Sequence, residues 1–171
     1  MADDMAGTDG RAGTDGLART VFRAAERVDV PAIVALLADD AVAAERESAL
    51  VPEGVDARYW SAFDAIDADP RNVLVVADSG GEVVGTMQLT FIPSLTHRGG
   101  ERAQIEAVRV RADQRGAGLG RQMISWAVDQ ARQRGCQLVQ LTTDKRRTDA
   151  HRFYASLGFQ LSHEGMKLPL R

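Results

Sequence analysis

The chain contains little that would tie it to an oxidising compartment or to a lipid bilayer. Cys136 is the only cysteine among 171 residues, so no disulfide can form within the chain. No apolar run approaches the ~20 residues that a membrane-spanning helix needs. The first four residues, Met1 to Asp4, are acidic where a secretory signal has a basic start and an apolar stretch. We therefore expect a cytoplasmic protein that does not associate with membranes.

Two common ligand classes also lack their sequence signals. No group of cysteine, histidine and aspartate residues has the spacing of metal ligands, so we expect no metal. The net charge of −3 divides unevenly, because residues 26–82 hold 13 acidic and 4 basic side chains and residues 98–171 hold 14 basic and 7 acidic ones. The basic side chains are scattered rather than grouped with aromatic residues, so nucleic-acid binding is not expected.

The most informative stretch is the glycine-rich segment from Gln114 to Arg121. It lies between an apolar run typical of a strand, residues 103–111, and a run with helical periodicity, residues 119–134. Glycines at such a junction let a ligand approach the backbone. The helix that follows presents N–H groups without intrahelical partners and the positive end of its dipole. Together these features predict a phosphate-binding cradle.

The spacing within this segment excludes two familiar cradles. A P-loop needs Lys-Ser or Lys-Thr, and neither dipeptide occurs in the chain. A dinucleotide fingerprint needs Gly-x-Gly-x-x-Gly in the first strand–helix unit, whereas these glycines alternate and come late in the chain. What remains is Arg-x-x-Gly-x-Gly from Arg115 to Gly120, followed about 30 residues later by Phe-Tyr-x-x-Leu-Gly-Phe from Phe153 to Phe159. The two motifs together resemble those of the GNAT superfamily of acetyl-CoA-dependent N-acetyltransferases.

Apolar periodicity and turn signals predict the order of elements along the chain. The order is typical of an α/β (α+β) fold, a mixed, mostly antiparallel twisted sheet with helices on both faces, which is also what the GNAT resemblance implies. The expected strands are 17–25, 73–78, 83–92, 102–111, 137–143 and final strands near 159–169. The expected helices are one from Asp29 that could continue to about 46, then 55–68, 119–134 and 148–157.

The domain organisation is simple. Residues 1–16 repeat Ala-Gly-Thr-Asp-Gly and hold few apolar side chains, which predicts a flexible N-terminal tail. Residues 17–171 are long enough to bury one core and are expected to form a single acetyltransferase domain.

The resemblance assigns cofactor-binding roles to two segments. Backbone N–H groups of the loop would bind the pyrophosphate of acetyl-CoA. The preceding strand would part from its neighbour and offer backbone groups to the pantetheine arm, and an N–H near Val108 would polarise the thioester carbonyl. The cofactor-binding residues would be Val108, Arg109, Val110, Arg115, Gly116, Ala117, Gly118, Leu119, Gly120, Arg121 and Tyr154.

Two side chains are candidates for the proton transfers of acetyl transfer. The resemblance makes Tyr154 the general acid that protonates the departing thiolate, and a phenol with a pKa near 10 suits that role. The alternative is a core aromatic. Glu106 is the candidate base, acting directly or through water, and the alternative is a salt bridge with Arg109. Strand alternation places Glu106 opposite Ile105 and on the side of Val108, unless a bulge near residue 107 alters this facing.

The expected function is transfer of acetyl from acetyl-CoA to a primary amine of a small molecule or peptide. A cationic amine would suit the acidic half of the chain, and coenzyme A the basic half. Transfer of a longer acyl group and a non-catalytic acyl-CoA sensor remain alternatives. Many superfamily members carry Asn seven residues before the tyrosine, where this chain has Arg147, so a cofactor contact at that position stays open. The resemblance also implies a homodimer, for which residues 163–170 could supply an edge.

Overall fold

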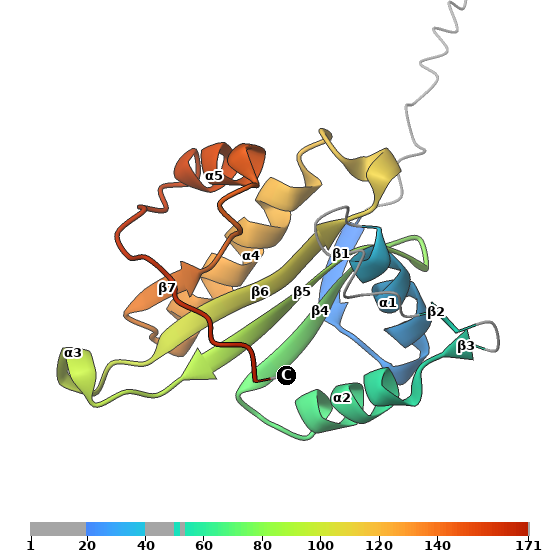
Figure 1. The fold of residues 1–171 in the computed structure, drawn as a ribbon, viewed down its shortest axis with the longest axis horizontal. Coiled ribbons are helices and arrows are strands. Elements are labelled where there is room, and N and C mark those ends of the chain that lie inside the picture. Colours follow the sequence, from blue (N-terminus) through green and yellow to red (C-terminus); the bar gives the residue numbers. More distant parts are fainter. Residues whose placement is uncertain (1–19, 40–49, 52–53, 171) are drawn as a thin grey trace, which may run out of the picture.

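The computed structural model describes residues 20–39, 50–51 and 54–170, which form one five-stranded sheet with helices packed against it (Figure 1). The strands lie in the spatial order β1-β4-β5-β6-β7, and all neighbours are antiparallel except β6 and β7. This confirms the expected mixed, mostly antiparallel sheet. The strands are β1 (Thr20–Ala24), β4 (Asn72–Ser79), β5 (Glu82–Ile92), β6 (Arg102–Val110) and β7 (Leu138–Leu141). The expected tail over 1–16 and the continuation of the first helix to about 46 lie outside the described residues.

Helices cover both faces of the sheet, as expected. On one face, α1 (Val30–Ala38) and α2 (Ala57–Asp67) pack against the strands, and on the other lies α4 (Leu119–Arg134) with α5 (Thr148–Ala155) beside it (Figure 1). Five short elements were not predicted, because two to four residues carry no readable periodicity. They are the hairpin of β2 (Leu50–Val51) with β3 (Gly54–Val55), the single turn α3 (Thr96–Gly99), and the 3-10 turns η1 (Arg27–Asp29) and η2 (Ala112–Gln114).

The core consists of two apolar layers that share the sheet. Met87 of β5, Ile105 of β6 and Met123 of α4 are almost completely buried in the layer between the sheet and α4. Val34 of α1 and Val76 of β4 are buried in the layer beneath α1 and α2. The sheet is therefore buried on both faces, and its position relative to α1 and α4 is determined by apolar packing.

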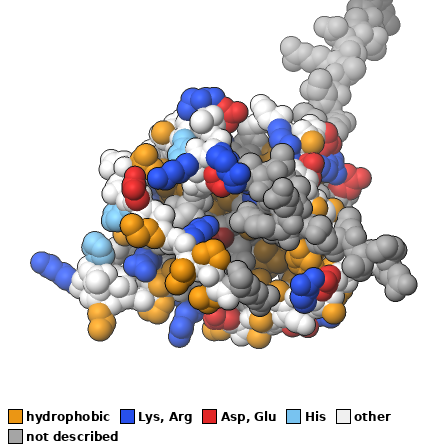
Figure 2. Space-filling view, in the orientation of Figure 1, with side chains coloured by type: hydrophobic (Ala, Val, Ile, Leu, Met, Phe, Trp, Pro, Cys, Tyr) orange, Lys and Arg blue, Asp and Glu red, His pale blue; other side chains and the backbone are white. Residues whose placement is uncertain are grey.

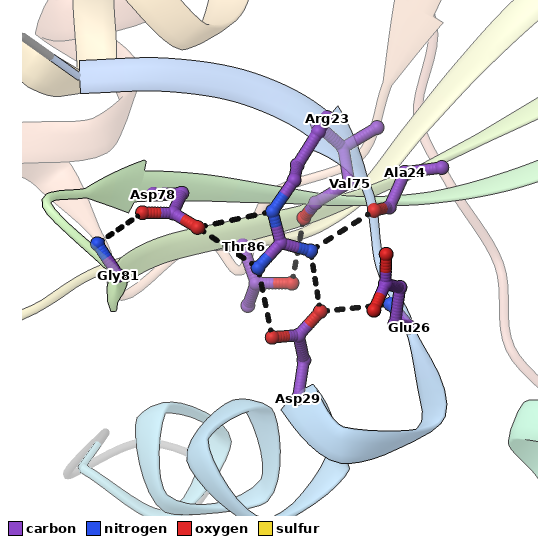
Figure 3. A network of polar contacts seen from close by, with 8 residues as sticks. All are labelled: Arg23, Ala24, Glu26, Asp29, Val75, Asp78, Gly81 and Thr86. Atoms are coloured by element: carbon purple, nitrogen blue, oxygen red, sulfur yellow. Dashed lines mark hydrogen bonds and ion pairs between the residues drawn. The ribbon is translucent and has the colours of Figure 1, made fainter.

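A cluster of charges fastens the start of α1 to the sheet (Figure 3). The carboxylate of Asp29 accepts hydrogen bonds from Arg23 Nη1 at 2.7 Å and Nη2 at 3.0 Å, and from the N–H of Glu26 at 2.7 Å. Arg23 also donates from Nε to Asp78 Oδ2 at 3.0 Å, close to the β4–β5 turn. Asp29 is only 5% exposed, and its hydrogen bonds with Arg23 hold the pKa of its carboxyl below the usual range.

The prediction of strands near 159–169 is wrong for the described chain. Residues 159–170 follow α5 and its terminal turn without regular secondary structure, and none of them belongs to a strand ladder within the described residues. The apolar alternation that suggested strands is present at Met166, Leu168 and Leu170. A strand also needs a neighbour that satisfies its backbone hydrogen bonds, and periodicity alone cannot supply one.

Candidate active site

The predicted cradle lies where η2 leads into α4. Gly116 and Gly118 adopt left-handed backbone conformations, with φ of 80° and 88°. A Cβ atom built at either position would meet nothing within 4 Å, so the loop is open on that side. The first hydrogen bond of α4 joins the N–H of Gln122 to the carbonyl of Gly118 at 3.1 Å, which leaves the N–H groups of the preceding first turn without intrahelical acceptors. An open glycine loop that ends in a helix N-terminus fits a pyrophosphate group.

The third glycine of the motif has a different role. A Cβ on Gly120 would lie 3.6 Å from Phe153 Cζ and 3.8 Å from Val110 Cγ2, which is ordinary contact distance. The first turn of α4 therefore packs directly against α5 and the end of β6. Alanine would fit at this position, whereas a longer side chain would separate the three elements. Arg121 adds a polar link, because its Nη2 donates to Ser156 Oγ at 3.0 Å.

The side chain of Arg115 fastens the loop to the rest of the protein. Its Nε donates to the carbonyl of Val110 at 2.9 Å, and its Nη2 donates to Asp39 Oδ2 at 2.8 Å and to the Asp39 carbonyl at 3.2 Å. The motif had suggested only a cofactor-binding residue here. The contact with Asp39, which follows α1 and lies 76 residues away, was not predicted, because no local pattern in the sequence indicates it.

β6 and β7 part beside this loop. Their ladder runs from Arg102 opposite Leu138 to Ile105 opposite Leu141, while β6 continues to Val110. The separation leaves the second half of β6 without a neighbour on that side among the described residues. The backbone groups of Val108 to Val110 therefore lie on the strand segment between the cradle and the parting of the strands, and their contact with the pantetheine arm stays a prediction.

The bulge near residue 107 is present and changes the facing of Val108 relative to Glu106. Ala107 has φ of 53°, and the register between β5 and β6 shifts at this point. The extra residue brings Val108 onto the same face as Ile105, and both pack in the layer beneath α4. Glu106 is exposed and aligned with Gln88 of β5. Glu106 therefore faces away from Ile105, as expected, but also away from Val108, which corrects the simple alternation.

Tyr154 lies in the last turn of α5 as a half-buried residue. Its ring makes edge contacts with Phe153 and Phe159, at centroid distances of 5.1 and 5.8 Å, and packs against the layer beneath α4. Burial raises the pKa of Tyr154, and the positive charges of Arg109 and Arg147 act in the opposite direction. The phenol is consequently protonated at neutral pH, as a proton donor must be. Packing and proton donation are compatible at this position, because only the ring is needed for packing.

Two charged neighbours of this tyrosine come from different elements. Arg109 lies on β6 and donates from Nη1 to the carbonyl of Val108 at 2.9 Å. Arg147 precedes α5, and the N–H of His151 donates to its carbonyl at 3.1 Å. Their shared influence on Tyr154 joins the strand that parts from β7 to the start of α5. Both positive charges thus act on the Tyr154 hydroxyl and oppose the rise in its pKa that burial causes.

Comparison with known proteins assigns the chain to a class. Residues 34–159 match the acetyltransferase (GNAT) family, so the chain belongs to that family, and its named relatives show that it is an N-acetyltransferase. It is 38% identical over 105 residues to the aminoalkylphosphonate N-acetyltransferase of Salmonella typhimurium, which covers 61% of this chain and 68% of the relative. It is 34% identical over 90 residues to the glucosamine 6-phosphate N-acetyltransferase of Trypanosoma brucei, which covers 53% of this chain and 59% of that relative.

A solved structure agrees with the fold. The crystal structure of a transcriptional regulator from Bacillus halodurans C-125 is 45% identical and superimposes with a TM-score of 0.85, covering 89% of this chain and 100% of that one. Within the part of the chain that the structure describes, no helix is long and apolar enough to cross a membrane. The same residues include no group of three or more metal-binding side chains.

Proposed function

We propose that the protein transfers the acetyl group of acetyl-CoA to the primary amine of a small molecule that also carries a phosphonate or phosphate group. The observation that carries the first half is the open glycine cradle at the start of α4, beside the parting of β6 and β7. The second half is supported by the two curated relatives. Their names specify acceptors that combine an amine with a phosphorus oxyanion.

The charges near Tyr154 favour such an acceptor. Arg109 and Arg147 both act electrostatically on its phenol, so a cationic region adjoins the proposed proton donor. Guanidinium groups bind phosphonate and phosphate through charge-assisted, often bidentate, hydrogen bonds. We infer that these arginines orient the oxyanion of the acceptor, so that its amine faces the acetyl group.

The roles of the other residues follow from their placement. Acetyl-CoA, when bound, supplies an acetyl group activated as a thioester. The N–H groups from Gly116 to Arg121 hold its pyrophosphate, and the backbone of Val108 to Val110 aligns the pantetheine arm. An N–H near Val108 stabilises the negative charge that develops on the carbonyl oxygen. Glu106, exposed beside the bulge, accepts the proton that the amine loses, directly or through water.

Tyr154 completes the proton balance by donating its phenolic proton to the departing sulfur. Tyr154→Phe keeps the ring contacts with Phe153 and Phe159 and removes only the donor. We expect kcat to fall by about 10²–10⁴-fold, with acetyl-CoA affinity and melting temperature little changed. Tyr59→Phe is the matched control, because Tyr59 is the only other tyrosine of the chain and lies on α2, where it packs against the core on the opposite face of the sheet. Near-normal kcat in Tyr154→Phe would assign this tyrosine to packing alone.

A thiol-release assay with paired amines tests the acceptor class. 2-Aminoethylphosphonate is compared with ethylamine, and glucosamine 6-phosphate with glucosamine, each with acetyl-CoA. We expect kcat/KM to be at least about tenfold higher for one phosphorus-bearing amine than for its neutral partner. Arg147→Gln should reduce this preference without weakening acetyl-CoA binding.

Other outcomes of the assay would redirect the proposal. Equal rates with both members of each pair, or a preference for peptide amines, would show that no oxyanion is recognised. Acetyl-CoA binding without thiol release for any amine would favour the non-catalytic sensor. Faster turnover with a longer acyl-CoA than with acetyl-CoA would favour transfer of that larger group.

A further inference from the structure

Polar side chains lie on the face of the sheet that is turned away from α4. Met87 of β5 and Ile105 of β6 are buried beneath α4, so their neighbours Gln88 and Glu106 point to the opposite face. α1 and α2 pack on that same face, in front of the sheet in Figure 1. Figure 2 shows side chains of both charges mixed with hydrophobic ones on this side of the molecule. A ligand there would therefore be recognised by single groups rather than by a field of one sign.

Gln88 and Glu106 are direct neighbours across two strands. They are aligned in the antiparallel pair of β5 and β6, immediately before the bulge at Ala107. Side chains at such positions have Cβ atoms about 4.5–5.5 Å apart. Glu106 is exposed and Gln88 is half-buried. An amine that gives a proton to Glu106 therefore lies within reach of the Gln88 amide.

A chain of hydrogen bonds determines which atom of the Gln88 amide faces a ligand. Hydrogen bonds from the N–H of Arg71 and from Asn72 lower the pKa of the Asp69 carboxyl, which is therefore ionised at neutral pH. A carboxylate can only accept hydrogen bonds, so Asn72 presents its Nδ2 to Asp69 Oδ2, at 2.8 Å. Asn72 Oδ1 then accepts from Gln88 Nε2 at 3.0 Å and from Thr90 Oγ1 at 2.7 Å. Because Asn72 holds the nitrogen of Gln88, the amide oxygen is the atom left for a ligand.

An amide oxygen beside the proposed base suits the amino group of an acceptor. A protonated primary amine has three N–H donors, so Glu106 can accept one while Gln88 Oε1 accepts a second. Transfer of the first proton to Glu106 frees the lone pair, and the second hydrogen bond keeps the nitrogen in place for attack on the thioester carbon. The N–C bond then forms, the C–S bond breaks, and the sulfur takes the proton of Tyr154. Gln88 itself neither gains nor loses a proton.

We propose that Gln88 Oε1 binds the amino group of the acceptor beside Glu106, and that Asp69 and Asn72 are positioning residues that keep this oxygen turned towards the amine. The proposal rests on the acetyl transfer to an amine described above, but not on the phosphonate or phosphate group of the acceptor. It adds a binding residue from β5 to the site, and this residue favours acceptors whose nitrogen carries more than one N–H group.

Calorimetry on protein saturated with coenzyme A measures this hydrogen bond without turnover. The probes are 2-aminoethylphosphonate and its N,N-dimethyl derivative, which are both protonated at neutral pH but carry three and one N–H groups on nitrogen. We expect the native protein to bind the primary amine at least about tenfold more tightly than the dimethyl compound. In Gln88→Leu this ratio should fall to about threefold or less, because the second acceptor is gone. Unchanged affinity for coenzyme A shows that the variant is folded.

Thr90→Val is the matched control. It removes the other hydrogen bond to Asn72 Oδ1 with little change in shape, and it leaves the Gln88 amide in place. The native ratio of affinities should therefore be retained. Equal ratios in native protein and Gln88→Leu would overturn the proposal, and so would an equal fall in Thr90→Val, because the amide would then serve only the hydrogen-bond network.

Two further measurements separate the parts of the proposal. Asn72→Ala should also reduce the ratio, because it frees the Gln88 amide to turn, and an unchanged ratio would overturn the positioning role. If 2-aminoethylphosphonate is not acetylated, the phosphorus-bearing acceptor class fails, and ethylamine with N,N-dimethylethylamine replaces the pair. A ratio that falls in Gln88→Leu with these amines would still support the role of Gln88, whereas an unchanged ratio would overturn it.

Discussion

The substitution Asp29→Asn tests whether the charge cluster at the start of α1 stabilises the fold. The isosteric amide keeps the shape of the side chain but removes the negative charge that accepts two hydrogen bonds from Arg23. The amide can also present N–H groups towards the guanidinium, with which they cannot form a hydrogen bond. The hydrogen bond from the N–H of Glu26, at 2.7 Å, is weakened as well.

The loss of stability expected for Asp29→Asn depends on the partners that Arg23 keeps in this variant. Removing one partner of a fully buried ion pair typically costs about 3–5 kcal/mol. Here the side chain of Arg23 is 32% exposed and keeps Asp78 at 2.9 Å, so its charge does not become isolated. We therefore expect a loss of about 2 kcal/mol in the free energy of unfolding. For a chain of this length, that loss lowers the melting temperature by about 4–8 °C.

Thermal unfolding followed by circular dichroism measures the shift. Asp113→Asn serves as the control, because Asp113 pairs with Arg111 at 2.7 Å but is 56% exposed, and exposed pairs contribute little. Equal melting temperatures for native protein and Asp29→Asn at pH 7 would refute the reasoning, since the buried contacts would then contribute nothing net.

The pH dependence gives an independent check with a definite sign. The pKa of Asp29 is lowered in the folded state, chiefly by its hydrogen bonds with Arg23. Its contribution to stability is therefore complete above the unfolded pKa of about 3.9 and is lost as the pH falls through the lower folded value. The difference in the free energy of unfolding between the native protein and Asp29→Asn should be constant near pH 7 and should shrink towards zero below about pH 4. A difference that persists unchanged in acid would indicate that shape, rather than charge, is responsible.

Two further predictions concern the cradle and the N-terminus. Gly118→Glu should abolish acetyl-CoA binding measured by calorimetry, because it places a negative side chain in the open cradle. Gly135→Glu is the control, because Gly135 has a similar φ of 82° and open surroundings at the other end of α4. This variant should carry similar backbone strain and still bind acetyl-CoA. Unchanged affinity in a folded Gly118→Glu protein would contradict the assignment. A chain that begins at Leu17 should keep its melting temperature and its affinity for acetyl-CoA. Residues 1–16 hold too little apolar surface to offset the conformational entropy that they would lose on becoming ordered, and β1 begins only at Thr20. A clear loss of either property would show that the segment contributes to the fold.

Structural features that depend only on neighbouring residues could be predicted from the local sequence. The open glycine-rich junction around Gly116 and Gly118 and the start of α4 directly after it were predictable from a few adjacent residues. The same holds for the hairpin of β4 and β5, whose apolar runs flank a short Gly-rich turn. The parting of β6 and β7 and the bulge near residue 107 could be expected only because the motifs resemble those of the GNAT superfamily.

The sequence alone determined the family, the order of the main elements and the position of the cradle, because these depend on motifs and periodicities within about 10–20 adjacent residues. Only the tertiary structure decided that Val108 lies on the face opposite to Glu106, since one extra residue at Ala107 reverses the alternation beyond it. It also decided that Arg115 contacts Asp39 and that burial raises the pKa of Tyr154. Finally, it showed that the apolar alternation at Met166, Leu168 and Leu170 has no strand partner within the described chain. Contacts between residues far apart in the chain depend on how whole elements pack, and no local pattern encodes that packing.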